Sequence, residues 1–105
     1  MKGGANAKRK GSNFEREVKA YLESKGFFCI RQPRSAFPDL LAIEYKDGVH
    51  KVYCIECKMN KYISGAERGE LQILKFKFGM IPFIAYRISY NHIGFCDMFY
   101  NETFI

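Results

Sequence analysis

Residues 38–58 read PDLLAIEYKDGVHKVYCIECK, and this stretch decides the fold. It contains two runs rich in aliphatic and aromatic residues, 38–45 and 49–58, which favour extended backbone and predict two strands. Between them, at 46–48, lies the sequence Lys-Asp-Gly, the strongest short hairpin signal in the chain. The stretch therefore predicts two antiparallel strands that are neighbours in one sheet.

The hairpin carries a group of charged residues. Glu56 and Lys58 are two residues apart on the second strand, so their side chains share one face. Asp39 lies at the start of the first strand, where the turn lets it approach the Glu56 end of its partner. Two converging carboxylates beside a lysine suit a hard cation such as Mg²⁺ and the hydrolysis of a phosphodiester. The lysine would orient a water or stabilise developing charge. A simple ion pair at a strand end is the alternative interpretation of Glu56 and Lys58.

Two helices are predicted by their capping patterns. Ser12 followed by Glu15 predicts a helix over about 13–25, with apolar residues at helical spacing. Glu15 lies at the edge of the apolar stripe, so it could overhang the carboxylate pair as well as cap the helix. The sequence Ser-Gly-Ala-Glu at 64–67 repeats the pattern and predicts a second helix to about residue 78.

The remaining elements complete a single α/β domain in the order α-β-β-β-α-β-β. Further strands are predicted at 27–31, 83–89 and 93–98. A chain of 105 residues with 48% hydrophobic residues fits one folded domain and excludes a disordered chain. No run approaches the roughly 18 apolar residues that a membrane span needs, and the first ten residues lack the apolar segment of a secretory signal. We therefore expect a soluble protein without membrane contact.

The four cysteines are interpreted as reduced and mostly buried. Cys54 and Cys57 form a C-x-x-C within a predicted strand, where residues three apart point to opposite faces and the thiols diverge. A redox pair would prefer a helix start, and a zinc site would need a second pair of ligands. Reduced thiols indicate an intracellular protein, in the cytoplasm or nucleoid, or in the host cytoplasm if the chain is viral.

Positive charge is concentrated at the beginning of the chain. The net charge is +6, and residues 1–12 contribute +4 of it without any acid. Lysine and arginine side chains gain free energy by displacing counterions from phosphates. A flexible basic arm over 1–12, ahead of a domain over 13–105, therefore favours a polyanion partner. A solubilising tail is the alternative interpretation.

Together these motifs resemble a known family. Pro38-Asp39 followed by Ile55-Glu56-Cys57-Lys58 resembles the PD-(D/E)xK nuclease signature. With its surroundings it is similar to the archaeal Holliday-junction resolvases over roughly residues 10–98. The resemblance implies a restriction-endonuclease-like nuclease core, a central mixed β-sheet of about five strands flanked by helices. It also implies an Mg²⁺-dependent endonuclease that cuts four-way DNA junctions with paired symmetric nicks, and we expect Mn²⁺ to substitute. The matching segments are 11–17, 26–31, 35–39, 55–58 and 78–82.

The resemblance further implies roles for individual residues. Glu15, Asp39 and Glu56 match the metal-associated acids of the family. Lys58 matches its catalytic lysine, and Ser35 matches a serine in a mobile loop near the scissile phosphate. Arg16 and Arg31 match family arginines important for activity or substrate binding, and Arg87 occupies a position where relatives carry a lysine. The residues expected to contact DNA are Lys8, Arg9, Lys10, Arg16, Arg31, Arg34 and Arg87.

Other functions stay open. A nuclease of the same fold could act on nicks, flaps or ordinary duplex, because branch selectivity depends on the shape of the binding surface. A catalytically silent DNA-binding module would gain nothing from carboxylates near phosphates. A regulator or partner-binding domain would leave the inward-facing acids unexplained. No small-molecule substrate is expected.

The second helix predicts a homodimer. It has two apolar lines at helical spacing, displaced by about 200° at ~100° per residue. One line should cover the sheet, and the other would remain an exposed apolar patch on a monomer of this size. A two-fold dimer would bury that patch and set two sites side by side, as two matched nicks require. The sheet-facing line is Leu71, Leu74 and Phe78, and the interface line is Ile73, Phe76 and Met80.

The basic arm generates the first testable prediction. Deletion of residues 1–10 should weaken binding to four-way junction and duplex alike and flatten the salt dependence, because the arm offers charge without base readout. Titration of labelled junction and duplex over a range of salt concentrations measures both quantities. If affinity and salt slope are unchanged by the truncation, the arm is only a tail.

Overall fold

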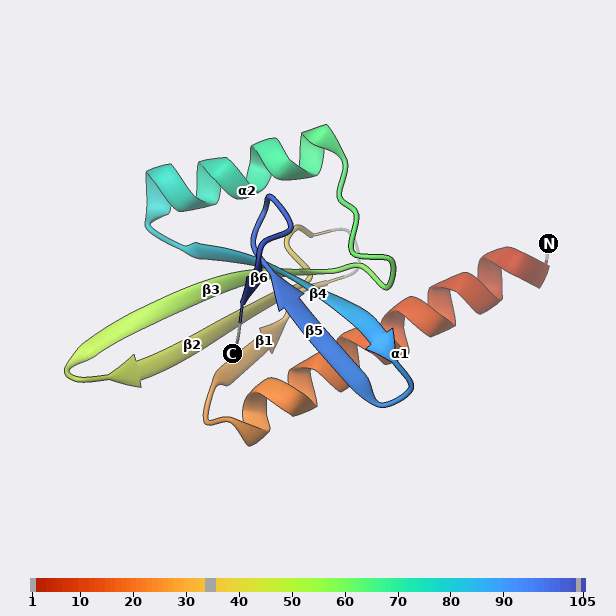
Figure 1. The fold of residues 1–105 in the computed structure, drawn as a ribbon, viewed down its shortest axis with the longest axis horizontal. Coiled ribbons are helices and arrows are strands. Elements are labelled where there is room, and N and C mark those ends of the chain that lie inside the picture. Colours follow the sequence, from red (N-terminus) through yellow and green to blue (C-terminus); the bar gives the residue numbers. More distant parts are fainter. Residues whose placement is uncertain (1, 34–35, 104) are drawn as a thin grey trace.

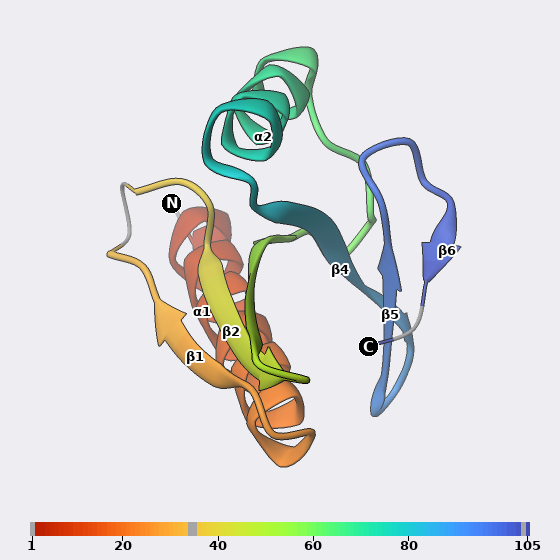
Figure 2. The ribbon, with the colours of Figure 1, turned by 90° about the vertical axis from the view of Figure 1, so that its left-hand side faces the viewer.

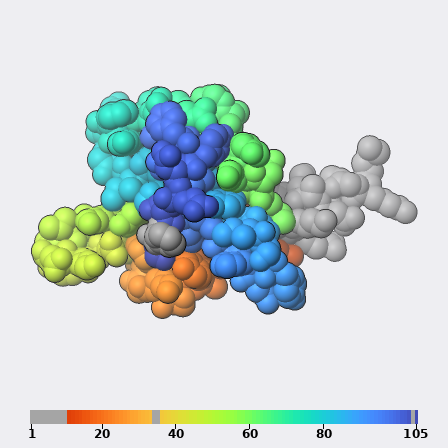
Figure 3. All heavy atoms as spheres, viewed as in Figure 1, coloured from red at the N-terminus to blue at the C-terminus, as the bar shows by residue number. Residues whose placement is uncertain are grey.

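The predicted hairpin is present and sets the register of the sheet. In the computed structural model, β2 (Leu40–Lys46) and β3 (Val49–Cys57) pair antiparallel, with Lys46 opposite Val49 and Leu40 opposite Ile55. Asp47 and Gly48 both have positive φ, 54° and 77°, as a tight two-residue turn requires. The tip of this hairpin projects from the body of the molecule (Figure 3).

Within the described part of the chain, six strands form one mixed sheet in the order β1-β2-β3-β4-β5-β6. β3 and β4 run parallel, joined by a crossover through α2, and the other neighbouring pairs of described strands run antiparallel. The fold class is therefore confirmed, with one short strand more than the five expected. The structure describes the backbone of residues 2–33, 36–103 and 105, and the side chains of this part from residue 11 onward. The other elements are α1 (Lys2–Ser24), β1 (Phe28–Arg31), α2 (Gly65–Phe78), β4 (Ile81–Ser89), β5 (His92–Cys96) and β6 (Glu102–Thr103).

The predicted beginning of the first helix is wrong. α1 starts at Lys2 and continues without a break through Ser12, which therefore lies inside the helix and does not cap it. The hydroxyl of Ser12 accepts a hydrogen bond from Arg31 at 2.6 Å, so a contact with β1 has taken the place of the capping box. Alanines and lysines in the first ten residues favour helix, and no proline interrupts them. The division between an arm and a domain at residue 12 stays a prediction. No helix of the described chain is long and apolar enough to cross a membrane.

The second helix begins as its sequence predicts. The Ser64 hydroxyl accepts from the backbone N–H of Glu67 at 3.0 Å, and the Glu67 carboxylate accepts from the backbone N–H of Ser64 at 2.8 Å. These two bonds are the reciprocal capping box. The helix ends at Gly79, whose φ of 69° is the left-handed conformation that glycine adopts readily.

The two helices cover opposite faces of the sheet (Figures 1 and 2). One apolar cluster lies on the α1 side and contains Val18, Leu22 and Ile55. The other lies on the α2 side and contains Leu71 and Cys54. Cys54 belongs to the second cluster, whereas Cys57 packs against the first, so the two thiols diverge as predicted. All four cysteines are free.

The last strands differ from the sequence predictions at their ends. β4 starts at Ile81 and includes Pro82, and β5 ends at Cys96. The predicted extension of the fifth strand to residue 98 is wrong, because Asp97 begins a turn closed by hydrogen bonds of its backbone and side chain to Asn101. That turn returns the chain to pair as β6 with β5.

The apolar lines of α2 are partly confirmed. Leu71 is fully buried, and Ile73 and Phe76 are 56% and 77% exposed, as predicted for an uncovered face. Two assignments are wrong, because Phe78 is 60% exposed and Met80 packs against the α2-side cluster. The helix has ended by Met80, and the left-handed turn that precedes this residue directs it to the core, so helical spacing no longer applies there.

Candidate active site

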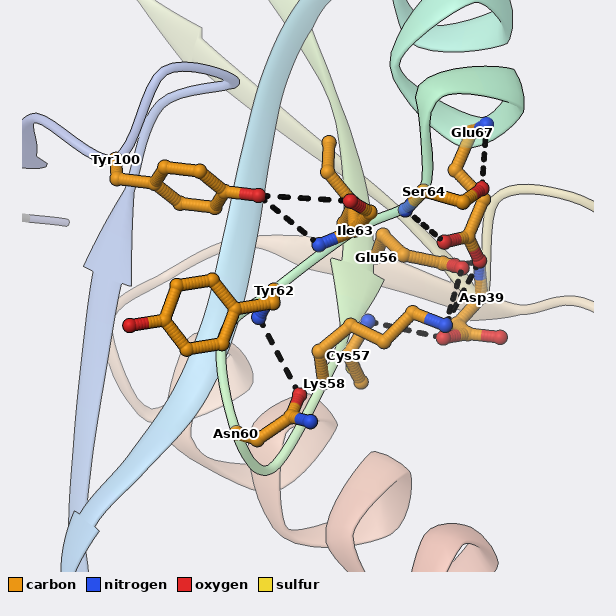
Figure 4. A network of polar contacts seen from close by, with 10 residues as sticks. All are labelled: Asp39, Glu56, Cys57, Lys58, Asn60, Tyr62, Ile63, Ser64, Glu67 and Tyr100. Carbon is orange, nitrogen blue, oxygen red and sulfur yellow. Dashed lines mark hydrogen bonds and ion pairs between the residues drawn. The ribbon is translucent and has the colours of Figure 1, made fainter.

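The hairpin brings Asp39 and Glu56 together. Asp39 precedes β2 by one residue, and the register places it opposite Glu56 on β3. The backbone N–H of Asp39 donates to Glu56 Oε1 at 3.2 Å, and the backbone N–H of Cys57 donates to Asp39 Oδ2 at 2.9 Å. Both carboxylates are thus held by backbone groups of the partner strand, which fixes their orientation. The predicted convergence of these two acids is confirmed (Figure 4).

Lys58 extends from the end of β3 toward this pair. Its ammonium lies 4.0 Å from Glu56 Oε2 and only 2.8 Å from Glu67 Oε2, a carboxylate at the beginning of α2. Burial acts to lower the pKa of Lys58, but the Glu67, Glu56 and Asp39 carboxylates outweigh it and raise the pKa. Lys58 is therefore a charged ammonium at neutral pH. It is suited to stabilise negative charge and cannot serve as a base.

Glu56 is a buried carboxyl group, 5% exposed. Burial is the main cause that raises its pKa, and the neighbouring carboxylates of Asp39 and Glu67 raise it further. A buried acid beside two other acids is costly for stability unless a positive charge approaches it. The oxygen donors of Asp39 and Glu56 thus form a set to which a hard divalent cation is the natural complement.

Glu15 faces a hollow beside the carboxylate pair. The hollow has a volume of about 490 Å³ and is lined by residues of α1, by Arg31 at the end of β1, by Gln32 and Pro33 that follow it, and by Asp39. In this structure Glu15 Oε1 accepts from Arg31 Nε at 3.1 Å. Within the part of the chain described here, no three acid, His or Cys side chains gather closely enough to hold a metal ion. Glu15 as a third metal-associated acid stays a prediction.

Among the arginines expected to contact DNA, those whose side chains the structure describes are paired or exposed. Arg87 donates two hydrogen bonds, of 2.7 and 2.6 Å, to the Glu17 carboxylate, and its guanidinium lies 5.0 Å from the centre of the Phe14 ring. This bidentate bond from Arg87 lowers the pKa of Glu17. Arg16 is exposed on α1. Arg34 and Ser35 lie outside the described residues, as do the side chains of Lys8, Arg9 and Lys10.

Two acids near the site escaped the sequence analysis. Glu17 is not among the residues that the sequence predicts for the site, because its contact with Arg87 on β4 joins residues 70 positions apart. Glu67 was found as a capping residue, but its second oxygen reaches Lys58. The capping pattern was the available signal for Glu67. The contact with Lys58 depends on how the loop after β3 folds, which no local pattern specifies.

The sequence of the chain is similar to those of known junction-cleaving enzymes. The family model for the archaeal Holliday junction resolvase matches residues 6–103. The chain is 35% identical over 85 residues to the crossover junction endodeoxyribonuclease Hjc of Methanocaldococcus jannaschii, a match that covers 77% of this chain and 61% of that relative. The chain thus spans less than two thirds of the length of this curated relative.

A solved structure shares the fold. It is the Holliday junction resolvase Hjc of Archaeoglobus fulgidus, with a TM-score of 0.68 and 27% sequence identity. The superposition covers 85% of this chain and 73% of the other. The mixed sheet with a helix on each face is therefore an arrangement shared with this resolvase.

The burial of Glu56 generates a prediction about stability. Its pKa is raised to about 9 in the folded state, so as the pH rises above about 4.5 the carboxyl group ionises more readily in the unfolded chain, and the free energy of unfolding falls. Glu56→Gln keeps the acceptor for the Asp39 N–H and adds an amide donor for the Asp39 carboxylate. At pH 7.5 with EDTA this variant should gain about 1–2 kcal/mol, or several degrees in Tm, and the gain should shrink at pH 4. Thermal unfolding followed by circular dichroism measures the gain in stability. A Tm of Glu56→Gln at pH 7.5 below that of the parent would contradict the prediction.

Proposed function

The chain belongs to the archaeal Holliday junction resolvase family, and we propose that it is a structure-selective endonuclease that cuts four-way DNA junctions by phosphodiester hydrolysis. The observation that carries this proposal is the convergence of Asp39, Glu56 and Lys58 at the end of one hairpin. A protein that only bound DNA would be weakened by carboxylates near phosphates. Together with the match to the family model, these acids favour hydrolysis over binding alone.

A divalent cation fits the donor set, and we propose Mg²⁺, with Mn²⁺ as a substitute. Asp39 and Glu56 would hold it, because their carboxylates converge and the buried Glu56 lacks a full counter-charge. A bound Mg²⁺ supplies a polarised phosphate oxygen and a water of lowered pKa. Glu15, which lines the adjacent hollow, is proposed as the third acid of the site.

The protein's own groups would perform the remaining steps. The Lys58 ammonium is available to stabilise the charge that develops on the phosphate. The backbone N–H groups of Asp39 and Cys57 keep the two acids in place before substrate arrives. Ser35 is proposed to lie near the scissile phosphate. The proposed DNA contacts are Lys8, Arg9, Lys10, Arg16, Arg31, Arg34 and Arg87.

Cleavage of defined DNA structures tests this function. The purified protein should nick a labelled four-way junction symmetrically with Mg²⁺, leave matched linear duplex intact, and be inactive in EDTA. Asp39→Asn should lower the cleavage rate by about a hundredfold or more while junction binding stays within about twofold, because the substitution removes a ligand charge but no phosphate contact. Asp97→Asn, in the turn before β6, is the matched control and should cleave normally.

Two outcomes would contradict the assignment. Robust Mg²⁺-dependent nicking by Asp39→Asn would exclude Asp39 from the site. Equal cutting of junction, flap and linear duplex would favour the second candidate, a nuclease of the same fold without selectivity for four-way junctions.

We further propose that the working unit is a two-fold dimer. On the α2 side of the sheet, Ile73 and Phe76 are exposed on the helix. On β1, Cys29 belongs to the α1-side cluster, so strand alternation turns the exposed Phe28 and Ile30 to the α2 side as well. These four exposed apolar side chains lie on one side of the sheet, whereas the surface of an ordinary monomer carries such residues scattered singly. A second copy of the chain would cover them. Paired sites would suit the two nicks needed to resolve a junction.

A charge placed in this surface should separate the protomers. Phe76→Glu should weaken dimerisation by about a hundredfold or more, because a carboxylate would have to be desolvated in an apolar contact. Tyr90→Glu is the control, since Tyr90 is 91% exposed in the turn between β4 and β5. Sedimentation equilibrium measures the change, and paired nicking should be lost before junction affinity. An unmutated protein that sediments as a monomer at micromolar concentration would contradict the dimer.

A further inference from the structure

Glu67 brings a third carboxylate to the candidate site, from an element other than the hairpin. It occupies the first turn of α2, and its Oε2 lies 2.8 Å from Lys58 Nζ. The distance from Lys58 Nζ to Glu56 Oε2 is 4.0 Å. The nearer partner of the lysine is therefore Glu67 rather than the acid two residues before it. Figure 4 shows the lysine extended between the hairpin and the beginning of the helix.

The two oxygens of the Glu67 carboxylate have different partners. Oε1 accepts from the backbone N–H of Ser64 at 2.8 Å and completes the capping box, whereas Oε2 pairs with Lys58. The capping bond fixes the orientation of the carboxylate, so the lysine is held by a group that cannot rotate freely. The carboxylate side chain is 23% exposed, which limits screening of the ion pair by solvent.

The segment between Lys58 and the helix is itself held in place. The backbone N–H of Lys61 donates to the Lys58 carbonyl at 2.8 Å, and the Tyr100 hydroxyl accepts from the Ile63 N–H at 3.2 Å. Arg68, in the first turns of α2, donates to the same hydroxyl at 3.1 Å. These bonds fix the beginning of α2 relative to the end of β3. The position of the Glu67 carboxylate is therefore set before any substrate binds.

Capping does not explain why this residue is an acid. A capping box needs only an acceptor oxygen at this position, and glutamine serves as well as glutamate. A full charge here is unfavourable for the nearby Glu56, whose pKa it raises. The Ser64 N–H at 2.8 Å and the Lys58 ammonium at 2.8 Å both favour the ionised carboxylate of Glu67. The charge also favours the first turn of α2, but its nearest charged partner is the Lys58 ammonium at 2.8 Å.

We propose that Glu67 is a positioning residue, which holds the Lys58 ammonium beside the Asp39–Glu56 pair so that the lysine meets the reacting phosphate in one orientation. This inference rests on the proposed nuclease function and assigns to α2 a part in the chemistry. Without the Glu67 charge, Lys58 would keep only the 4.0 Å contact with Glu56 and would sample more rotamers. Misplacement of a reacting group by about 1 Å costs up to about a hundredfold in rate.

Three variants separate positioning from capping. Glu67→Gln keeps the acceptor for the Ser64 N–H but removes the charge that pairs with Lys58. Ser64→Ala removes the N-cap hydroxyl but leaves the carboxylate. Glu70→Gln removes an exposed acid one turn along the same helix and controls for net charge. Single-turnover cleavage of a four-way junction at saturating protein, junction Kd and Tm are measured for each.

Slow cleavage by Glu67→Gln, but not by Ser64→Ala or Glu70→Gln, supports the proposal. Glu67→Gln should cleave at least about tenfold more slowly at unchanged Kd, and its Tm should fall because the side chain no longer carries the charge that pairs with Lys58 and favours the first turn of α2. Ser64→Ala should lower Tm but cleave within about twofold of the parent, and Glu70→Gln should match the parent. If Glu67→Gln cleaves at the parental rate while the parent cuts junctions, the positioning role is excluded and the nuclease function stands.

A measurement without DNA tests the contact independently of cleavage. In lysine-¹⁵N-labelled protein, the paired Lys58 ammonium should give a slowly exchanging ¹H–¹⁵N signal that persists in Ser64→Ala and disappears in Glu67→Gln. Absence of that signal from the parent protein would overturn the proposal whatever the nuclease assays show.

Discussion

The register of the β2–β3 hairpin is the constraint on which the rest of the structure depends. The turn at Asp47-Gly48 pairs Lys46 with Val49, and every later pair follows from it up to Leu40 opposite Ile55. One step further along the same register, Asp39 meets Glu56. A slip of one residue would turn the side chains of one strand to the opposite faces of the sheet. The same slip would therefore separate Asp39 from Glu56 and expose apolar core residues. Stability and site geometry therefore select the same register.

This coupling follows from the alternation of side chains along β3. Ile55 packs on the α1 side, whereas Cys54 and Glu56 point to the α2 side. A strand buried on both faces supports both apolar clusters, and its end carries the polar groups where the covering helices leave space. The buried carboxyl group of Glu56 is costly in its ionised form. The backbone N–H of Asp39 and the ammonium of Lys58 offset that burial, and the backbone N–H of Cys57 holds the half-buried Asp39 carboxylate beside it.

α2 connects the site to the outer surface of the molecule. Its first turn contributes the Glu67 carboxylate to Lys58, and its outward face carries Ile73 and Phe76. One helix of 14 residues thus contacts the candidate active site at its first turn and carries the proposed dimer contact on its outward face. α1 has a similar double position, because it covers the opposite cluster and also lines the hollow next to Asp39.

Features of the chain that depend on local chemistry could be predicted from the sequence alone. They include the Asp-Gly turn, the alternation that separates Cys54 from Cys57, the capping box of α2, and the approach of Asp39 to Glu56. Each is determined by residues close together in the chain or by the period of a strand, so the relevant interactions are already present in the sequence pattern.

Other features were decided only by the tertiary structure. Ser12 lies within α1 and bonds Arg31, Met80 turns into the core past a left-handed residue, and Glu67 pairs with Lys58 across the loop after β3. In each case a group with a plausible local role takes a partner from another element. The free energy of that contact depends on how the elements pack, which the spacing of residues along the chain does not encode.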